Sequence, residues 1–265
     1  MKLTIIILIC RINKHDRICM IGRFKYDKEI FYGEVKGNRV IVDRGLYSDT
    51  FLLNDLAILP PASPTKIICV GLNYRDHAKE LDMQIPDDPL IFLKPPSAVI
   101  GHFGKIVYPK GSKQIDYEGE LAVIINKRCK NIRASDGQSV IMGYTCLNDV
   151  TARDLQSKDT QWTRSKSFDT FAPIGPYITA PELDVGDLAI KTRVNGELRQ
   201  NSNTNNLIFD VPYLIEFISS IMTLERGDMI STGTPPGVGE LSVGDDVEVE
   251  IENIGILKNN VIAQE

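Results

Sequence analysis

The sequence is poor in the residue types that usually bind zinc. It contains three histidines and five cysteines in 265 residues, with no CxxC pair and no HExxH or HxH pair. A zinc site made of thiolates or imidazoles is therefore not expected, and an odd number of cysteines argues against a complete disulfide framework. This cysteine usage is best explained by reduced thiols in a cytoplasmic enzyme.

Long apolar runs and blocks of like charge are also missing. The formal net charge is −5, and no basic cluster interrupts it, so neither nucleic acid nor a membrane is an expected partner. The apolar run in MKLTIIILIC at 1–10 is too short to span a bilayer, and no small-residue cleavage site follows it. We expect residues 1–19 to be an N-terminal extension and Met20 to be the physiological start.

The remaining sequence indicates two structural parts. Residues 20–62 alternate between apolar and polar positions around turn residues, which predicts a small β-rich module. The Pro- and Ser-rich stretch PPASPTK at 60–66 marks a boundary, after which residues 63–265 form a larger domain. Strands outnumber helices and do not alternate with them, so the prediction is an α+β, mostly β fold of the mixed β-sandwich or roll type with few helices.

Three local signals refine this prediction. Asn195–Gly196 predicts a hairpin turn, and apolar residues at helical spacing predict a helix over 211–222. A further helix is expected from about Thr151, with Thr151 or Asp149 as its N-terminal cap.

The stretch DYEGELAVII at 116–125 raises an electrostatic problem. In a strand, Asp116, Glu118 and Glu120 point to one face, and like charges so placed repel one another. A hard divalent cation such as Mg²⁺ or Mn²⁺ would relieve the repulsion, with Asp149 as a third ligand from the end of another strand. The alternative is a strand end whose carboxylates are simply solvated.

Seven motifs in order resemble the fumarylacetoacetate hydrolase superfamily over about residues 64–261. They are GLNYRDHAKE at 71–80, FLKP at 92–95, DYEGELAVII at 116–125, NDVTARDLQ at 148–156, KSFDTF at 166–171, NGELRQ at 195–200 and GDMISTGTPPGVG at 227–239. The resemblance implies that residues 63–265 are a fumarylacetoacetate hydrolase-like catalytic domain. It is strongest to the small acylpyruvases, oxaloacetate decarboxylases or tautomerases, and 2-hydroxyhepta-2,4-diene-1,7-dioate isomerases.

The resemblance also implies roles for individual residues. The metal ligands would be Glu118, Glu120 and Asp149, with Asp116 close by but not a direct ligand. The catalytic residues would be His77, Glu80 and Lys166: a His–Glu pair that moves a proton and a lysine at the substrate oxygen. The substrate-binding residues would be Arg153, Gln156 and Thr234. Leu72 stands where some relatives have arginine, which leaves the substrate open.

The function implied is an enzyme dependent on Mg²⁺ or Mn²⁺, with Ca²⁺ as a further option. It would act through a metal-stabilised enolate on a small 2-oxo or β-diketo acid, by hydrolysing acylpyruvates or by decarboxylating or tautomerising oxaloacetate-like acids. Two alternatives remain: an isomerase or decarboxylase of the 2-hydroxyhepta-2,4-diene-1,7-dioate and 5-carboxymethyl-2-hydroxymuconate pathway, and a non-catalytic metal-binding scaffold. A dicarboxylate or acylpyruvate substrate, a homodimer and a mobile lid over 79–89 are also expected.

Overall fold

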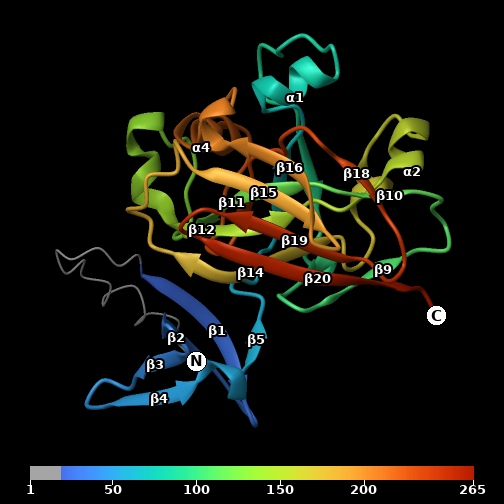
Figure 1. Cartoon of the computed structure of the whole chain (residues 1–265). Helices are drawn as coiled ribbons and strands as arrows, with labels where there is room; N and C mark the ends of the chain where they lie inside the picture. The colour runs from blue at the N-terminus through green and yellow to red at the C-terminus, as the bar shows by residue number, and fades with distance from the viewer. Residues whose placement is uncertain (1–18) are drawn as a thin grey trace.

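The computed structural model describes residues 19–265 and consists mainly of β-strands arranged in three sheets (Figure 1). The predicted mostly-β fold with few helices is therefore confirmed. The N-terminal extension lies almost wholly outside the described residues. Within the described chain, no helix is both long enough and apolar enough to cross a membrane.

The first five strands form the small unit drawn in blue in the lower part of Figure 1. They are β1 (Met20–Tyr26), β2 (Glu29–Lys36), β3 (Arg39–Asp43), β4 (Ser48–Leu52) and β5 (Ala57–Leu59). Phe24, Phe31 and Val40 are buried in a core of its own. Strand β1 also pairs with β14 through Met20 and Ile21, so one sheet continues from this unit into the larger body. The boundary at 62/63 stays a prediction.

The larger body contains the rest of that twelve-stranded sheet. Its strands are β6 (Ile67–Val70), β7 (Ile91–Lys94), β8 (Val99–Ile100), β11 (Gly119–Ile125), β12 (Ile141–Asn148), β14 (Ala172–Thr179) and β17 (Met229–Ser231). The sheet order is β4-β3-β2-β1-β14-β12-β11-β17-β6-β7, with β5 on β1 and β8 on β14. Strand β11 is therefore central, flanked by β12 and β17.

Two further sheets and four short helices complete the body. The five-stranded sheet has the order β16 (Glu197–Asn203), β15 (Ala189–Val194), β19 (Asp246–Ile251), β20 (Gly255–Ala263), β9 (Lys105–Tyr108). The three-stranded sheet has the order β13 (Thr151–Ala152), β10 (Ile115–Tyr117), β18 (Gly239–Leu241). The helices are α1 (Arg75–Glu80), α2 (Arg153–Lys158), α3 (Thr163–Lys166) and α4 (Val211–Ile221).

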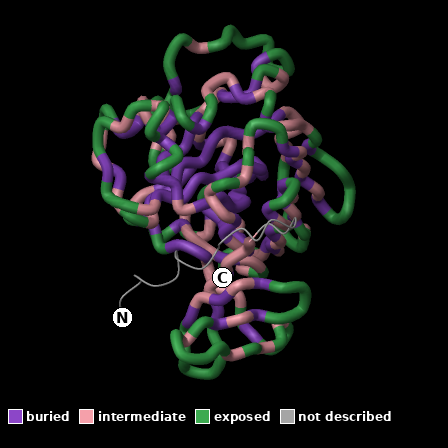
Figure 2. Tube along the Cα trace, turned by 90° about the vertical axis from the view of Figure 1, so that its left-hand side faces the viewer, coloured by how far each residue is buried: buried purple, intermediate pink, exposed green. Residues whose placement is uncertain are grey.

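Strand β11 is apolar at every position after Glu120 because both of its faces are covered. Leu121, Val123 and Ile125 belong to the main core, together with residues of β15, β19 and α4, while Ala122 and Ile124 face a second apolar cluster. All seven residues of the strand are buried. Figure 2 shows buried positions gathered in the middle of the larger body. Each fully buried leucine or isoleucine stabilises the fold by about 1.5–3 kcal/mol, so this strand is well anchored.

The local predictions had mixed outcomes. Asn195 and Gly196 have φ of 52° and 81° in the turn between β15 and β16, as a type I′ hairpin requires. Helix α4 begins at Val211 as expected, and Asp210 caps it by accepting a hydrogen bond from Tyr213 N at 2.9 Å. The predicted cap of the helix near Thr151 is wrong: α2 begins at Arg153 and has no side-chain cap.

The cysteine prediction also needs a correction. Cys69, Cys129 and Cys146 are buried free thiols, as expected. Cys19, the first described residue, is disulfide-bonded, so the expectation that every thiol is reduced is wrong.

His102 makes stability depend on pH. Its ring is half-buried and its Nδ1 accepts a hydrogen bond from Lys258 N at 3.1 Å. Burial first, and then the charge of Lys258, lower its pKa from 6.5 to about 4. Between pH 4 and pH 6.5 the unfolded chain binds a proton at His102 that the folded protein does not bind. The contribution of neutral His102 to the free energy of unfolding is therefore complete above pH 6.5 and is lost as the pH falls to 4.

We therefore predict that His102→Asn flattens the pH profile of stability in this window. The Asn Oδ1 can accept the same hydrogen bond without titrating. Denaturant unfolding at pH 7 and at pH 4.5 measures the change, and wild-type protein should lose more free energy of unfolding than the variant. Equal losses in both proteins would show that His102 does not contribute.

Candidate active site

Three carboxylates meet where β10, β11 and β12 come together. Glu118 and Glu120 flank Gly119 at the start of β11, and Asp149 follows β12, whose Asn148 is the register partner of Gly119. Asp149 N donates to Glu118 O at 2.8 Å, which fixes the two chain segments. One carboxylate oxygen from each residue lies within 4.8 Å of those of the other two, and all three residues are buried. The structure thus brings the predicted triad together, and the solvated alternative does not hold.

Cationic side chains compensate most of this charge. Lys166, at the end of α3, donates to Glu118 Oε2 at 2.9 Å and to Asp149 Oδ2 at 2.7 Å. Lys94, at the end of β7, donates to Asp149 Oδ1 and to Val150 O. Both lysines are almost completely buried, and burial of an ammonium group is tolerable only with such partners. Arg153 pairs with Glu118 and, at 2.8 Å, with Asp116.

Glu120 differs from the other carboxylates because no cation contacts it among the described residues. Its partners are neutral: the Ser231 hydroxyl, and the Gly233 N–H at 2.8 Å. Burial, then the charges of Asp149 and Glu118, raise its pKa well above the usual value. For Glu118 burial acts the same way, but Lys166 and Arg153 overcome it and lower the pKa to about 2.

The donor set fits a hard divalent cation. The cluster holds four buried carboxylates, counting Asp116, against three cationic side chains. With all four carboxylates ionised, one negative charge is left over and falls on Glu120, and a cation bound there would favour this ionised form. Each carboxylate oxygen has two acceptor positions, so the oxygens bound by lysine can still coordinate an ion. Oxygen-only donors of this kind suit Mg²⁺ or Mn²⁺.

His77 and Glu80 form a pair on α1. His77 Nδ1 and Glu80 Oε2 are 2.8 Å apart, one helical turn from each other, as their spacing predicted. The other Glu80 oxygen accepts a hydrogen bond from Gly237 N at 3.1 Å. The loop after β17 therefore contacts both groups: its Gly233 binds Glu120 of the triad, and its Gly237 binds Glu80 of the pair.

The three residues expected to bind substrate are held by protein groups. Arg153 contacts Gln156 Oε1 as well as its two carboxylate partners. The Thr234 hydroxyl donates to Gly119 O at 3.1 Å and accepts from Gln200 Nε2 at 2.8 Å. Its one proton is thus already committed, and a substrate carboxylate would have to compete for it. Substrate binding by these three residues stays a prediction.

Two residues of this site, Lys94 and Gln200, were not predicted from the sequence. Lys94 lies in the quoted FLKP motif, and a lysine inside an apolar strand just before proline was the available signal. Gln200 lies in NGELRQ and is completely buried. Its Oε1 accepts from Gly119 N at 2.9 Å, and its Nε2 donates to Thr234 Oγ1 and Pro235 O, both at 2.8 Å. Asp149, expected as a possible helix cap, is instead held by the two lysines.

Two glycines are required by this packing. A Cβ on Gly119 would lie 2.2 Å from Thr192 Oγ1, and one on Gly237 would lie 2.2 Å from Arg199 O. Gly237 also has a φ of +91°, which L-residues with side chains rarely adopt. Glycine at these two positions therefore lets β11 and the loop after β17 pack closely against β15 and β16.

Comparison with known proteins is consistent with this geometry. The family model described as fumarylacetoacetate (FAA) hydrolase C-terminal matches residues 66–262. The chain belongs to the fumarylacetoacetate hydrolase family. The enzymes of this family that resemble it act on small organic acids, which supports an enzymatic role.

Relatives in sequence include an archaeal and a mammalian protein. An uncharacterized protein of Methanocaldococcus jannaschii is 60% identical over 225 residues, which are 85% of this chain and 94% of that protein. A mitochondrial oxaloacetate tautomerase of Rattus norvegicus is 43% identical over 215 residues, which are 77% of this chain and 69% of the tautomerase.

Solved structures of the family superimpose on the whole described fold. The 2-hydroxyhepta-2,4-diene-1,7-dioate isomerase of Mycobacterium marinum has a TM-score of 0.84 and 38% identity, covering 93% of this chain and 99% of the isomerase. The maleylpyruvate hydrolase of Sphingobium sp. SYK-6, solved with manganese(II) and pyruvate, has a TM-score of 0.78 and 29% identity, covering 93% of this chain and all of the hydrolase.

Gln200 is expected to position the start of β11, which carries Glu120, and the loop after β17. We predict that Gln200→Leu lowers the free energy of unfolding by about 2–4 kcal/mol, because it leaves Gly119 N and Pro235 O buried without partners. Chemical denaturation measures this. Gln161→Leu, which alters an exposed glutamine, should change stability by less than about 1 kcal/mol. Similar effects of the two substitutions would contradict the role assigned to Gln200.

Proposed function

We propose that this protein is a divalent-metal-dependent enzyme that forms an enolate from a small 2-oxo or β-diketo acid. The observation that carries the proposal is the buried triad of Glu118, Glu120 and Asp149, whose Glu120 contacts no cationic side chain within residues 19–265. Mg²⁺ or Mn²⁺ held there would supply the positive charge that Glu120 lacks. The manganese and pyruvate in the maleylpyruvate hydrolase structure support the same kind of ion and substrate.

The residues around the triad can then be given roles. A bound cation supplies Lewis-acid polarisation of a substrate carbonyl. Lys166 adds a fixed positive charge beside the triad, where negative charge develops on the substrate oxygen. Glu80 accepts from His77 Nδ1, which leaves Nε2 to take a proton from water or substrate. Arg153 holds Glu118 in place.

Oxaloacetate-like acids are the first substrates to consider, because a named oxaloacetate tautomerase is 43% identical to this chain. Acylpyruvates are the second, since a family structure is a maleylpyruvate hydrolase. An enolate occurs in both reactions. Reprotonation of the oxaloacetate enolate gives the tautomer, whereas in hydrolysis water adds to the acyl carbonyl and cleavage of the C–C bond releases a carboxylic acid and the pyruvate enolate, which is then protonated.

A diene-dioate isomerase is the alternative function. The isomerase of M. marinum supports it at 38% identity over nearly the full length of both chains. A non-catalytic scaffold is disfavoured, because the triad, Lys166 and the His77–Glu80 pair are all present with their expected contacts. The homodimer, the cytoplasmic location and the lid stay predictions. Segment 81–90 is mostly exposed, including Leu81, Met83 and Ile85, as a lid that closes over substrate would require.

We predict that Glu118→Gln and Asp149→Asn each lower turnover of every substrate by more than about 100-fold. Replacing a residue that only hydrogen-bonds to a metal ligand lowers activity by at most about 100-fold, and loss of a ligand itself should cost more. The measurement is a panel of oxaloacetate, acetylpyruvate, fumarylpyruvate and 2-hydroxyhepta-2,4-dienedioate. Each is tested with metal-stripped protein and after Mg²⁺ or Mn²⁺ is restored.

Glu182→Gln, which alters an exposed glutamate, is the matched control and should retain activity. Full turnover by both triad variants, or by metal-stripped protein, would refute the proposal.

We further predict that His77→Ala separates the reactions. Hydrolysis of acetylpyruvate should fall by about 10²- to 10⁴-fold, because water loses its base. Oxaloacetate tautomerisation should fall less, since the polarised carbonyl already acidifies the α-proton. His102→Asn is the histidine control. Equal losses in both reactions would show that His77 is not specific to the water step.

A further inference from the structure

Two aromatic side chains lie beside the lysines that bind the triad. Phe92 precedes Lys94 by two residues in β7, so both side chains leave the same face of the strand. Trp162 precedes Lys166 by one helical turn, and Lys166 N donates to Trp162 O at 3.0 Å. Each of the two lysines that bind Asp149 thus has an aromatic ring next to it along its own element.

The two rings meet in space and reach the triad through Lys166. The ring centroids of Phe92 and Trp162 are 5.3 Å apart, and the rings meet edge to face at 74°. Lys166 Nζ lies 4.8 Å from the centroid of Phe92 while it donates to Glu118 and Asp149. Phe92 and Trp162, the aromatic pair, therefore adjoin the ammonium group that the proposed function places beside the substrate oxygen.

A second set of contacts leads from Glu120 to the same pair. Gly233, whose N–H donates to Glu120, packs so closely that a Cβ added to it would lie 3.3 Å from Gly71 O. A Cβ added to Gly71 would in turn lie 3.2 Å from Leu90 Cδ2 and 3.4 Å from Trp162 Cζ3. Leu90 and Trp162 therefore converge over Gly71. The aromatic pair is thus connected to the triad from two directions.

The sheet places Phe92 on the same side as the glutamates. Side chains alternate along β11, so Glu120 shares a face with Ala122 and Ile124. These two residues belong to the second apolar cluster, and Phe92 packs against that cluster. A substrate bound at the triad would therefore have the aromatic pair on its own side of the sheet.

The accessible part of this surface is apolar. Phe92 and Trp162 are half-buried and Leu90 is 52% exposed, so each offers surface to a ligand. The face of an aromatic ring carries partial negative charge, which disfavours a carboxylate against it. An aliphatic chain laid on the same surface would leave water and gain hydrophobic free energy. This surface thus favours an apolar group over a second acidic group.

We propose that the aromatic pair and Leu90 form a subsite for the far end of the substrate, and that this end is an aliphatic chain. The inference rests on the proposed function, because the triad and Lys166 would hold the 2-oxo acid end. From there the chain would extend over Phe92 towards Trp162. Acylpyruvates and other 2-oxo acids with an apolar tail are then the preferred substrates. Oxaloacetate would bind through the same end but gain nothing from the aromatic pair.

The first test uses 2-oxo acids that carry no scissile β-diketone. Calorimetric titration of the full-length, Mg²⁺-loaded protein compares pyruvate with 2-oxooctanoate. Each methylene group that leaves water is worth about fourfold in affinity, so we expect 2-oxooctanoate to bind at least about tenfold more tightly than pyruvate. Equal affinities would overturn the subsite and leave the metal site intact. If neither acid binds, both the subsite and the proposed function fail.

Variants of the subsite test whether the tail lies on Trp162. Trp162→Ala should reduce the preference for 2-oxooctanoate by about fivefold or more, and Trp162→Phe should keep most of it, since a smaller ring still covers the chain. Leu90→Ser, at a more exposed position, should reduce the preference by about threefold. Thermal unfolding confirms that each variant is folded. Retention of the full preference in both Trp162→Ala and Leu90→Ser would contradict the proposal.

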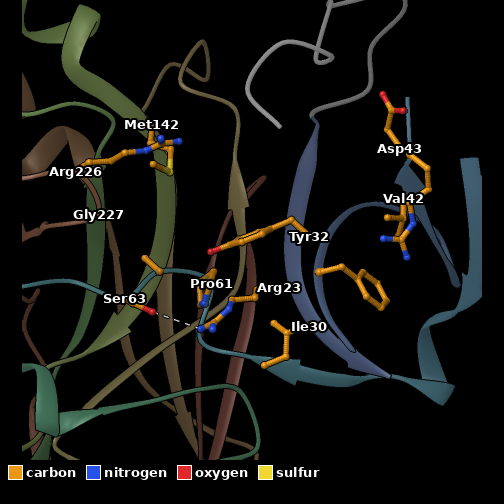
Figure 3. Close-up of a pocket in the computed structure, with 13 residues that line it drawn as sticks. Arg23, Ile30, Tyr32, Val42, Asp43, Pro61, Ser63, Met142, Arg226 and Gly227 are labelled. Carbon is orange, nitrogen blue, oxygen red and sulfur yellow. Dashed lines mark hydrogen bonds between the residues drawn. The ribbon is translucent and has the colours of Figure 1, made fainter. Parts of the chain in front are cut away.

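Tyr32→Ala is the matched control, because Tyr32 is a half-buried aromatic residue far from the triad in the chain's contacts. It lines a cleft of about 390 Å³ whose walls come from the small unit and the larger body (Figure 3). No residue that lines this cleft belongs to the triad, the His77–Glu80 pair or the aromatic pair. The control should keep the wild-type preference, and an equal loss in Tyr32→Ala would overturn the assignment to Trp162.

Trp162 also reports on the subsite directly, because it is the only tryptophan of the chain. Saturating 2-oxooctanoate should shift the emission of the Mg²⁺-loaded protein to shorter wavelength, since the chain displaces water from the ring. Pyruvate should shift it less. Unchanged emission with bound 2-oxooctanoate would show that the tail does not reach Trp162, which would overturn the proposal.

The same preference should appear in turnover. We expect kcat/KM for hexanoylpyruvate to exceed that for fumarylpyruvate, which carries a second carboxylate, by about tenfold or more. Equal values in wild-type protein would overturn the preference for an apolar tail. Absence of all turnover alongside tight binding of 2-oxooctanoate would instead support the subsite and count against the proposed function.

Discussion

Burial of clustered carboxylates is the constraint on which the rest of the site depends. Glu118 and Glu120 lie on either side of Gly119 at the start of β11, whose later residues are all core, and Asp149 is buried beside them, so water cannot solvate these carboxylates. Isolated charges in such a place are very costly. Lys94 and Lys166 must therefore be buried with them, and the charge left on Glu120 is what favours a cation. The two lysines and a bound ion would each neutralise part of the charge of the same carboxylates.

The loop after β17 connects the buried carboxylates to the His77–Glu80 pair. Gly233 donates to Glu120, and Gly237 donates to Glu80 four residues later. Gln200 joins the same loop to Gly119, between the two glutamates. A displacement of the loop would move the triad and the His77–Glu80 pair together. These hydrogen bonds thus fix the position of the triad relative to the His77–Glu80 pair, although the two groups come from distant parts of the chain.

Sequence patterns predicted the parts of this structure that depend on local chemistry. The mostly-β class, the Asn195–Gly196 hairpin and helix α4 followed from periodicity and turn residues, and the triad followed from alternation together with a family resemblance. Lys94 and Gln200 could not be predicted in the same way, because their roles arise from tertiary contacts with Asp149 and Gly119. The cap of α2 failed for a related reason: Asp149 is bound by lysines from two other elements and is not available to the helix.

The two halves of the site differ in burial, and this bears on which reaction the site favours. The triad is buried among strands and tied by several charged partners. The His77–Glu80 pair is on a six-residue helix, where the side chain of Glu80 is 43% exposed and is joined to the loop by a single hydrogen bond. A small movement of α1 would reposition the imidazole while leaving the carboxylates in place. Substrate polarisation is therefore set by the buried triad, whereas the choice between protonation and attack by water depends on where the more exposed His77–Glu80 pair places its base. Members of one family that kept the carboxylates could thus still differ in reaction, and the relatives of this chain include a tautomerase, an isomerase and a hydrolase.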